Sequence, residues 1–171
     1  MTTDSAITDS AAGDRAARET LIAEVIEQEK RLQFTSFNHD DAWMLGSSLR
    51  AHALAQGQAI TIDIARGEQR IFHCALPGTS AHNDVWIERK KRTVREFGAS
   101  SYLVGLRFPI LDSHELEAAP WMDPLQFSGH GGGFPLAIRG VGVVGTIAVS
   151  GLPHQIDHQL IVEAIERHLA A

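Results

Sequence analysis

The chain has 171 residues, the usual size of one domain, of which 44% are hydrophobic and 21% charged. No apolar run approaches the roughly 20 residues that span a bilayer, and residues 1–13 lack the basic start of a secretory signal, so we expect a cytoplasmic protein without a membrane partner. The net charge of -6 argues against general nucleic-acid binding. Cys74 is the only cysteine, which excludes an intramolecular disulfide and a cysteine-built zinc site.

The first part of the chain predicts a disordered tail followed by two helices. Residues 1–13 are rich in Thr, Ser, Asp and Ala without periodicity, which predicts disorder, and residues 14–171 are predicted to form a single domain. Apolar residues recur at helical spacing from Asp14 onward. A short edge strand over residues 32–37 and a second helix over residues 41–56 are expected next.

A β-hairpin is predicted after the second helix. Residues 59–65 alternate isoleucines with polar residues, and a second apolar run from Ile71 to Cys74 follows a short Gly-containing link. Asp63 lies on the strand face opposite the isoleucines. Because charged residues are mostly exposed, we expect Asp63 to be solvated rather than to line a covered pocket.

The third helix is predicted over residues 81–97 and carries a cluster of basic residues. Trp86 and Lys90 share one face of this helix with apolar residues. The Lys90 stem can lie along the edge of the core with its amine in water, or the amine can belong to a binding site for a carboxylate or phosphate.

A short helix or turn over residues 100–109 is expected, followed by a long loop, residues 112–133, whose Trp121, Met122 and Phe127 would need a partner surface. Two strands are then predicted, over residues 134–138 and 141–149.

Three glycines at and just before the second of these strands match a dinucleotide-binding pattern without its structural context. Gly140, Gly142 and Gly145 fit G-x-G-x-x-G, but the residues that follow continue as a strand. Phosphate binding by this pattern requires a helix N-terminus after the glycines. We therefore interpret these glycines as strand features such as a bulge.

The last helix, opened by Leu152-Pro153, contains the sequence's nearest approach to a metal site. His154, Asp157 and His158 lie at spacings i, i+3 and i+4, so their side chains can share an ion. Polar and acidic groups in a first helical turn also serve capping alone. No other histidine spacing in the chain indicates a metal site.

His130 lies within a glycine cluster that comprises Gly129, Gly131, Gly132 and Gly133. Glycines can leave backbone N–H groups and the imidazole accessible to a ligand, so His130 can bind an anion, ligate haem iron or relay a proton. The alternative is a flexible loop that needs glycines only for its turns.

These segments together resemble a known family. The motifs are L-Q-F at 32–34, D-A-W at 41–43, N-D-V-W-I-E-R-K-K at 83–91, F-G-A-S-S at 97–101, G-G-G-F-P at 131–135, and V-S-G-L-P with I-D-H at 149–158. Over roughly residues 21–169 the chain resembles the uncharacterised cytosolic branch of the haem-degrading-domain superfamily, related to GlcG and HbpS.

The resemblance implies an α/β (α+β) fold, a three-layer α-β-α sandwich with a mainly antiparallel sheet of about five strands, which assembles into homo-oligomers. It also makes haem the candidate cofactor. Two functions stay open: a small-ligand or haem-binding oligomer, or a non-enzymatic oligomeric module that binds a protein partner. The candidate ligand-binding residues are Asn83, Trp86, Lys90, His130, Gly131, Gly132, Gly133 and Phe134.

Overall fold

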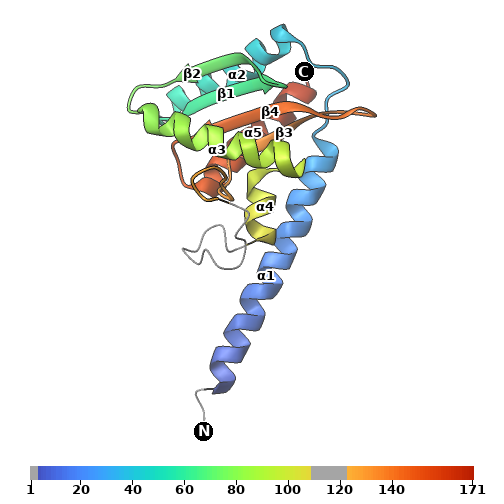
Figure 1. Ribbon diagram of the computed structural model, residues 1–171, viewed down its shortest axis with the longest axis vertical. Coiled ribbons are helices and arrows are strands. Elements are labelled where there is room, and N and C mark those ends of the chain that lie inside the picture. Colours follow the sequence, from blue (N-terminus) through green and yellow to red (C-terminus); the bar gives the residue numbers. More distant parts are fainter. Residues whose placement is uncertain (1–3, 109–122) are drawn as a thin grey trace.

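The computed structural model describes residues 4–108 and 123–171 of the chain, with side chains from residue 13 onward (Figure 1). Within them it forms five helices and four strands. The elements are α1 (Asp4–Arg31), α2 (His39–Ala55), β1 (Thr61–Arg66), β2 (Gln69–Ala75), α3 (Ala81–Phe97), α4 (Ser101–Arg107), β3 (Gly133–Ile138), β4 (Gly142–Ser150) and α5 (His154–Leu169).

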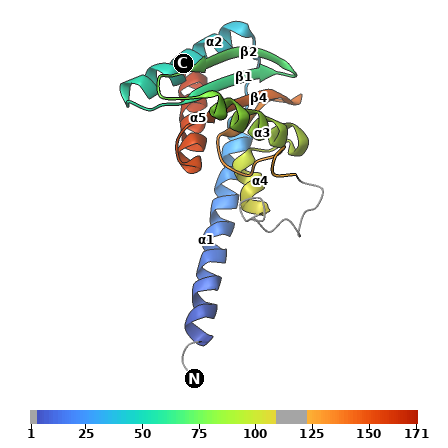
Figure 2. The same cartoon turned by 60° about the vertical axis from the view of Figure 1, so that its left-hand side comes forward.

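The four strands form one antiparallel sheet in the order β2-β1-β4-β3. Helices α2 and α5 cover one face of this sheet and α3 covers the other (Figures 1 and 2). The predicted three-layer α-β-α arrangement is confirmed. The central position of β1 and β4 explains why the isoleucine-rich and valine-rich runs of the sequence belong to these strands, since both of their faces are covered.

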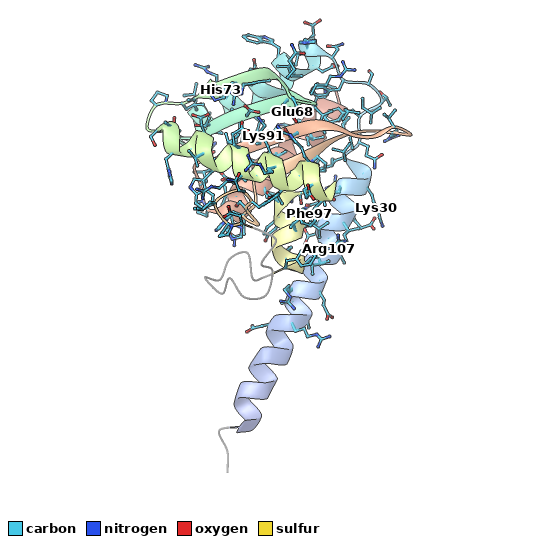
Figure 3. The ribbon with its side chains drawn as sticks, in the orientation of Figure 1. Lys30, Glu68, His73, Lys91, Phe97 and Arg107 are labelled. Atoms are coloured by element: carbon cyan, nitrogen blue, oxygen red, sulfur yellow. The ribbon has the colours of Figure 1, made fainter. Side chains whose placement is uncertain are left out.

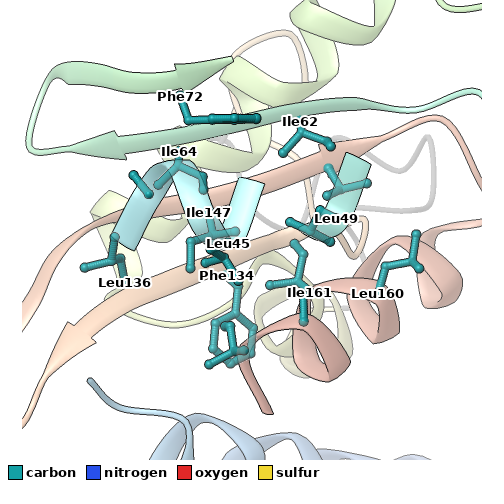
Figure 4. Packing of buried hydrophobic residues seen from close by; sticks show 14 of the residues in the cluster. Leu45, Leu49, Ile62, Ile64, Phe72, Phe134, Leu136, Ile147, Leu160 and Ile161 are labelled. Carbon is teal, nitrogen blue, oxygen red and sulfur yellow. The ribbon is translucent and has the colours of Figure 1, made fainter. Parts of the chain in front are cut away.

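The main hydrophobic core lies between the sheet and helices α2 and α5 (Figure 4). Alternate strand residues such as Ile62, Phe134 and Ile147 point into it, as the two-residue period of a strand requires. Helices contribute the residues spaced three or four apart, such as Leu45 and Leu49.

The opposite face of the sheet carries small and polar residues and lies against α3. Asp63 belongs to this face and is fully buried, so the prediction that it is solvated is wrong. Lys91 Nζ of α3 lies 2.9 Å from Asp63 Oδ1, and Arg70 Nε of β2 donates to Asp63 Oδ2. The sequence rule fails here because two cations compensate the buried carboxylate.

The predicted edge strand at residues 32–37 is reduced to a single bridge, so the sheet has four strands rather than about five. Phe34 pairs with β3 in parallel, donating its N–H to the Ala137 carbonyl and accepting from Arg139 N–H. Asn38 then caps α2, accepting from the N–H groups of Asp40 and Asp41. Because α2 begins so soon, the chain has no room to extend the pairing.

Helix α1 projects from the rest of the molecule as a long rod (Figures 1 and 2). It begins at Asp4, within the segment for which the sequence predicts disorder; the disordered tail itself stays a prediction. Residues 13–20 are exposed, whereas Val25 is buried in a second apolar cluster with Leu103 of α4. The C-terminal half of α1 therefore anchors the rod.

Candidate functional site

A pocket of about 290 Å³ lies where α3, the glycine loop at His130 and the start of α5 meet. It brings together four of the predicted ligand-binding residues, which come from segments about 40 residues apart. The lining residues are His82, Asn83, Trp86, Lys90, His130, Ser150, Gly151, Leu152, His154 and Asp157.

Helix α3 supplies one wall of the pocket. Its N-cap, Ser80, forms a capping box with Asn83, which fixes the first turn. Spacings of three and four residues then place Asn83, Trp86 and Lys90 on one side of the helix. Asn83 Nδ2 donates to the Ser150 carbonyl at 3.2 Å, so this wall is tied to the end of β4.

A buried ion pair joins this wall to α5. Lys90 Nζ donates to Asp157 Oδ2 and to the Val149 carbonyl, both at 2.9 Å, and Lys90 is only 3% exposed. Asp157 Oδ1 accepts from Leu152 N–H at 3.1 Å. Both carboxylate oxygens and two of the three ammonium protons are thus engaged, which is the arrangement a buried pair requires.

Burial acts on both partners of this pair against their charged forms. It lowers the pKa of Lys90, although the neighbouring Asp157 carboxylate opposes the shift. It raises the pKa of Asp157, which Lys90 and the backbone N–H of Leu152 oppose. The two shifts bring the proton affinities of amine and carboxylate closer together than they are in water.

The glycine cluster packs tightly instead of presenting open N–H groups. Gly131, Gly132, Gly133 and Phe134 are all buried and do not line the pocket, although the sequence places them in the ligand site. A Cβ on Gly131 would lie 2.2 Å from the His154 carbonyl oxygen. The N–H groups of Gly131 and Gly133 donate to other residues of the protein. Close approach to α3 and α5 thus explains the glycines, and Phe134 belongs to the main core.

Two of the three pocket histidines have hydrogen bonds that oppose metal ligation. Gly131 N–H donates to His154 Nδ1 at 3.3 Å, so the neutral ring carries its proton on Nε2. Trp86 Nε1–H donates to His82 Nε2 at 2.9 Å, so this nitrogen is already an acceptor. A metal at either Nε2 would have to displace a proton or a hydrogen bond.

His130 has a different set of contacts. Its Nδ1 lies 3.2 Å from Ser128 Oγ, a hydroxyl that can either accept or donate. When Nδ1–H donates to that oxygen, Nε2 carries a lone pair, which is the form that binds iron. The ring also contacts Trp86 and His154 edge to face, with centroids 5.2 and 5.4 Å apart. The geometry is compatible with haem ligation at this histidine.

The proposed three-residue metal group on α5 is turned toward three different neighbours. His154 accepts from Gly131, Asp157 pairs with Lys90, and His158 Nε2 bonds Gln28 Oε1 at 2.9 Å. Within residues 4–108 and 123–171, no three His, Cys, Asp or Glu side chains converge on a common point suited to a metal ion.

Sequence reasoning missed several of the residues that line the pocket, and two of its predicted partner-surface residues lie outside the described part. His82 lies one turn before Trp86 on α3, so helical spacing could have found it. The segment Ser150–Leu152 lies in the pocket wall, where it forms hydrogen bonds with Asn83 and Asp157. No sequence pattern indicates these contacts. Trp121 and Met122 lie outside the described residues. Phe127 is half-buried against the second apolar cluster.

The family is defined by comparison with known proteins. The model of the HbpS-like haem degrading proteins matches residues 37–166, so the chain belongs to this family. A UPF0303 protein of Streptomyces coelicolor is 49% identical over 148 residues, covering 86% of this chain and 93% of the relative. A second, from Streptomyces avermitilis, is 46% identical over 154 residues, covering 90% and 94%.

Solved structures share the fold. The Ybr137w protein superposes with a TM-score of 0.76 at 27% identity, covering 84% of each chain. A complex of PduOC with haem superposes with a TM-score of 0.61 at 14% identity, covering 77% of this chain and 94% of that one. None of the helices in the described part of the chain is long and apolar enough to cross a membrane.

Proposed function

We propose that this protein binds a small ligand in the pocket between α3, the His130 loop and α5, and that haem is a ligand of this pocket. The observation that carries the proposal is the convergence of Asn83, Trp86, Lys90 and His130 from distant segments into one cavity. A concave pocket with a few converging polar groups is the usual form of a ligand site, and its volume is near the lower end of the usual range of about 300–1,000 Å³.

Haem would be held through His130 Nε2, and the ring of His130 contacts the Trp86 ring. The haem complex of PduOC supports the choice of probe, because that protein shares the fold of this chain. Bound haem would supply an iron centre capable of redox chemistry.

The test is an absorbance titration of the purified, sized protein with hemin. We expect a saturable Soret shift at about one haem per subunit or per subunit interface. The variant His130→Ala should bind hemin at least about tenfold more weakly and with a changed spectrum, because the iron loses its ligand.

His39→Ala is the matched control, since His39 is an exposed histidine at the start of α2 and does not line the pocket. It should leave the titration unchanged. A featureless, non-saturating response of the wild-type protein would exclude haem as the ligand. An unchanged spectrum in His130→Ala would exclude His130 as the iron ligand.

We also propose that the protein self-associates, with a second copy of the chain covering the rod of α1. Residues 13–20 of this helix are exposed, and a helical segment without tertiary contacts is only marginally stable in water. Helix α2 adds an exposed Trp43, 68% accessible, beside the exposed Met44. Large exposed apolar side chains such as these are typical of association surfaces.

A further inference from the structure

We propose that Lys90 forms an imine with a small aldehyde or ketone that enters the pocket. This rests on the ligand pocket proposed above and adds a substrate class and a covalent step to it. The lysine amine, the adjacent carboxylate and the imidazoles of the same cavity supply the nucleophile, the proton acceptor and the proton donors that the step needs.

The position of the amine carries the proposal. Lys90 is 3% exposed and is one of the residues that line the cavity. Two of its protons are held by Asp157 and the Val149 carbonyl. A Cβ on Gly132 would lie 2.7 Å from Nζ, so only glycine at this position leaves room for the amine beside it.

The neighbouring lysine provides an internal comparison. Lys91 is also 3% exposed and also has a carboxylate at 2.9 Å, that of Asp63. Its Nζ contacts Glu88 as well, at 2.8 Å, and it does not line the pocket. Burial and ion pairing are therefore common to both lysines, and access to the cavity distinguishes Lys90.

The step balances without an oxidant or reductant. Asp157 accepts a proton from Lys90 Nζ, and the neutral amine attacks the carbonyl carbon to form a C–N bond while the C=O π electrons move to the oxygen, which takes up the proton that the nitrogen then loses. The resulting hydroxyl takes the proton that Asp157 returns, through His130 or His154 of the same cavity, and leaves as water while the nitrogen lone pair forms the C=N bond. The lowered pKa of Lys90 and the raised pKa of Asp157 both favour the first transfer.

The experiment exploits the three lysines of the chain, Lys30, Lys90 and Lys91. Lys30 is an exposed residue of α1, whereas Lys91 is a buried residue of α3 (Figure 3). The full-length protein is exposed briefly to propanal with cyanoborohydride, which reduces an imine to a stable amine. Peptide mass mapping then gives the extent of modification at each lysine and at the α-amino group.

We expect the adduct at Lys90 to exceed that at Lys91 by about tenfold or more because, of these two buried lysines, it is Lys90 that lines the cavity into which the aldehyde enters. It should also exceed that at Lys30. The variant Lys90→Arg should lose the pocket adduct while Lys91→Arg keeps it. Equal modification of Lys90 and Lys91, or an adduct confined to Lys30 and the α-amino group, would overturn the proposal.

A second experiment, with hemin added before propanal, tests the imine at Lys90 separately from the ligand pocket on which it rests. Prior saturation with hemin should protect Lys90, but not Lys30, from propanal. Hemin binding without any Lys90 adduct overturns the imine and leaves the pocket assignment standing. A Lys90 adduct in a protein that does not bind hemin supports the imine and removes haem as the ligand.

Discussion

His158 is a buried histidine whose environment makes stability depend on pH. It packs against Tyr102 and Phe134, with ring centroids 4.8 and 5.8 Å away, and its Nε2 bonds Gln28. Nδ1 is buried without a hydrogen-bond partner among the described residues. Burial, with a smaller contribution from His154, lowers the pKa of His158 from 6.5 to about 4.

The sign of the effect follows from this depressed pKa. Between about pH 6.5 and pH 4 the unfolded chain binds a proton at His158 that the folded protein does not, so the free energy of unfolding falls as the pH is lowered through this window. The loss from this residue is on the order of 3 kcal/mol. Urea unfolding at pH 7 and pH 4 measures it.

His158→Gln is the variant for comparison, because an amide can keep a hydrogen bond to Gln28 and cannot titrate. Its loss of stability between pH 7 and pH 4 should be smaller than that of the wild type by most of this amount. Parallel pH profiles for the two proteins would show that His158 is protonated in the folded state already near pH 6.

The Lys90–Asp157 pair predicts an asymmetry between single and double substitutions. Lys90→Met leaves a buried carboxylate without its cation and should lower the free energy of unfolding by about 3–5 kcal/mol. Lys90→Met combined with Asp157→Leu removes both charges and should lose much less. Lys30→Met, at an exposed ion pair, should change stability by less than about 1 kcal/mol. A double variant no more stable than the single one would contradict this account.

At the scale of elements, the glycine loop is held by close contact with α5. Gly131→Ala would place a Cβ 2.2 Å from the His154 carbonyl oxygen, and backbone cannot yield as a flexible side chain can. We expect a loss of about 1–3 kcal/mol in the free energy of unfolding, as for overpacked cores. Displacement of His130 from its ring contacts with Trp86 and His154 should also weaken hemin binding.

Gly13→Ala is the control, because nothing lies within 4 Å of a Cβ built on this exposed residue of α1. Alanine favours a helix over glycine, so the unfolding midpoint should stay the same or rise slightly. Equal destabilisation by the two substitutions would point to backbone freedom, and not to close approach, as the requirement at Gly131.

The sequence predicted the elements well where periodicity decides them. The hairpin of isoleucines, the helix over residues 81–97 and the final helix after Pro153 all depend on local patterns, and the structure confirms them. The prediction of a fifth strand over residues 32–37 is wrong because α2, with its cap at Asn38, begins directly after these residues. The prediction for Asp63 is wrong because Lys91, one of its compensating cations, comes from α3, which periodicity does not place against this strand.

The candidate site was predictable in part for the same reason. Asn83, Trp86 and Lys90 share one helix face, which spacing reveals, and His130 is marked by its glycines. The placement of His130 in one pocket with His154 and Asp157 depends on the strand order of the sheet, which periodicity alone does not give. The buried state of Gly131–Gly133 depends on the same packing.

At the scale of the whole molecule, the rod of α1 predicts the state of association. Deletion of residues 1–19 removes exposed helix and leaves Val25 and the α4 contacts in place. If a second copy covers the rod, the deletion should lower the mass measured by light scattering without moving the unfolding midpoint of the domain. An unchanged mass would assign association to another surface, such as that around Trp43.

The two faces of the sheet contact the helices through different kinds of side chain. Toward α2 and α5 the contact is apolar, so it weakens on cooling. Toward α3 it includes the buried pair of Lys91 with Asp63 of β1, whose cost of dehydration falls as temperature rises. Amide exchange of α3 should therefore quicken at extremes of pH before that of α2 does. Since α3 is one wall of the pocket, the cavity can loosen while the opposite half of the domain stays closed.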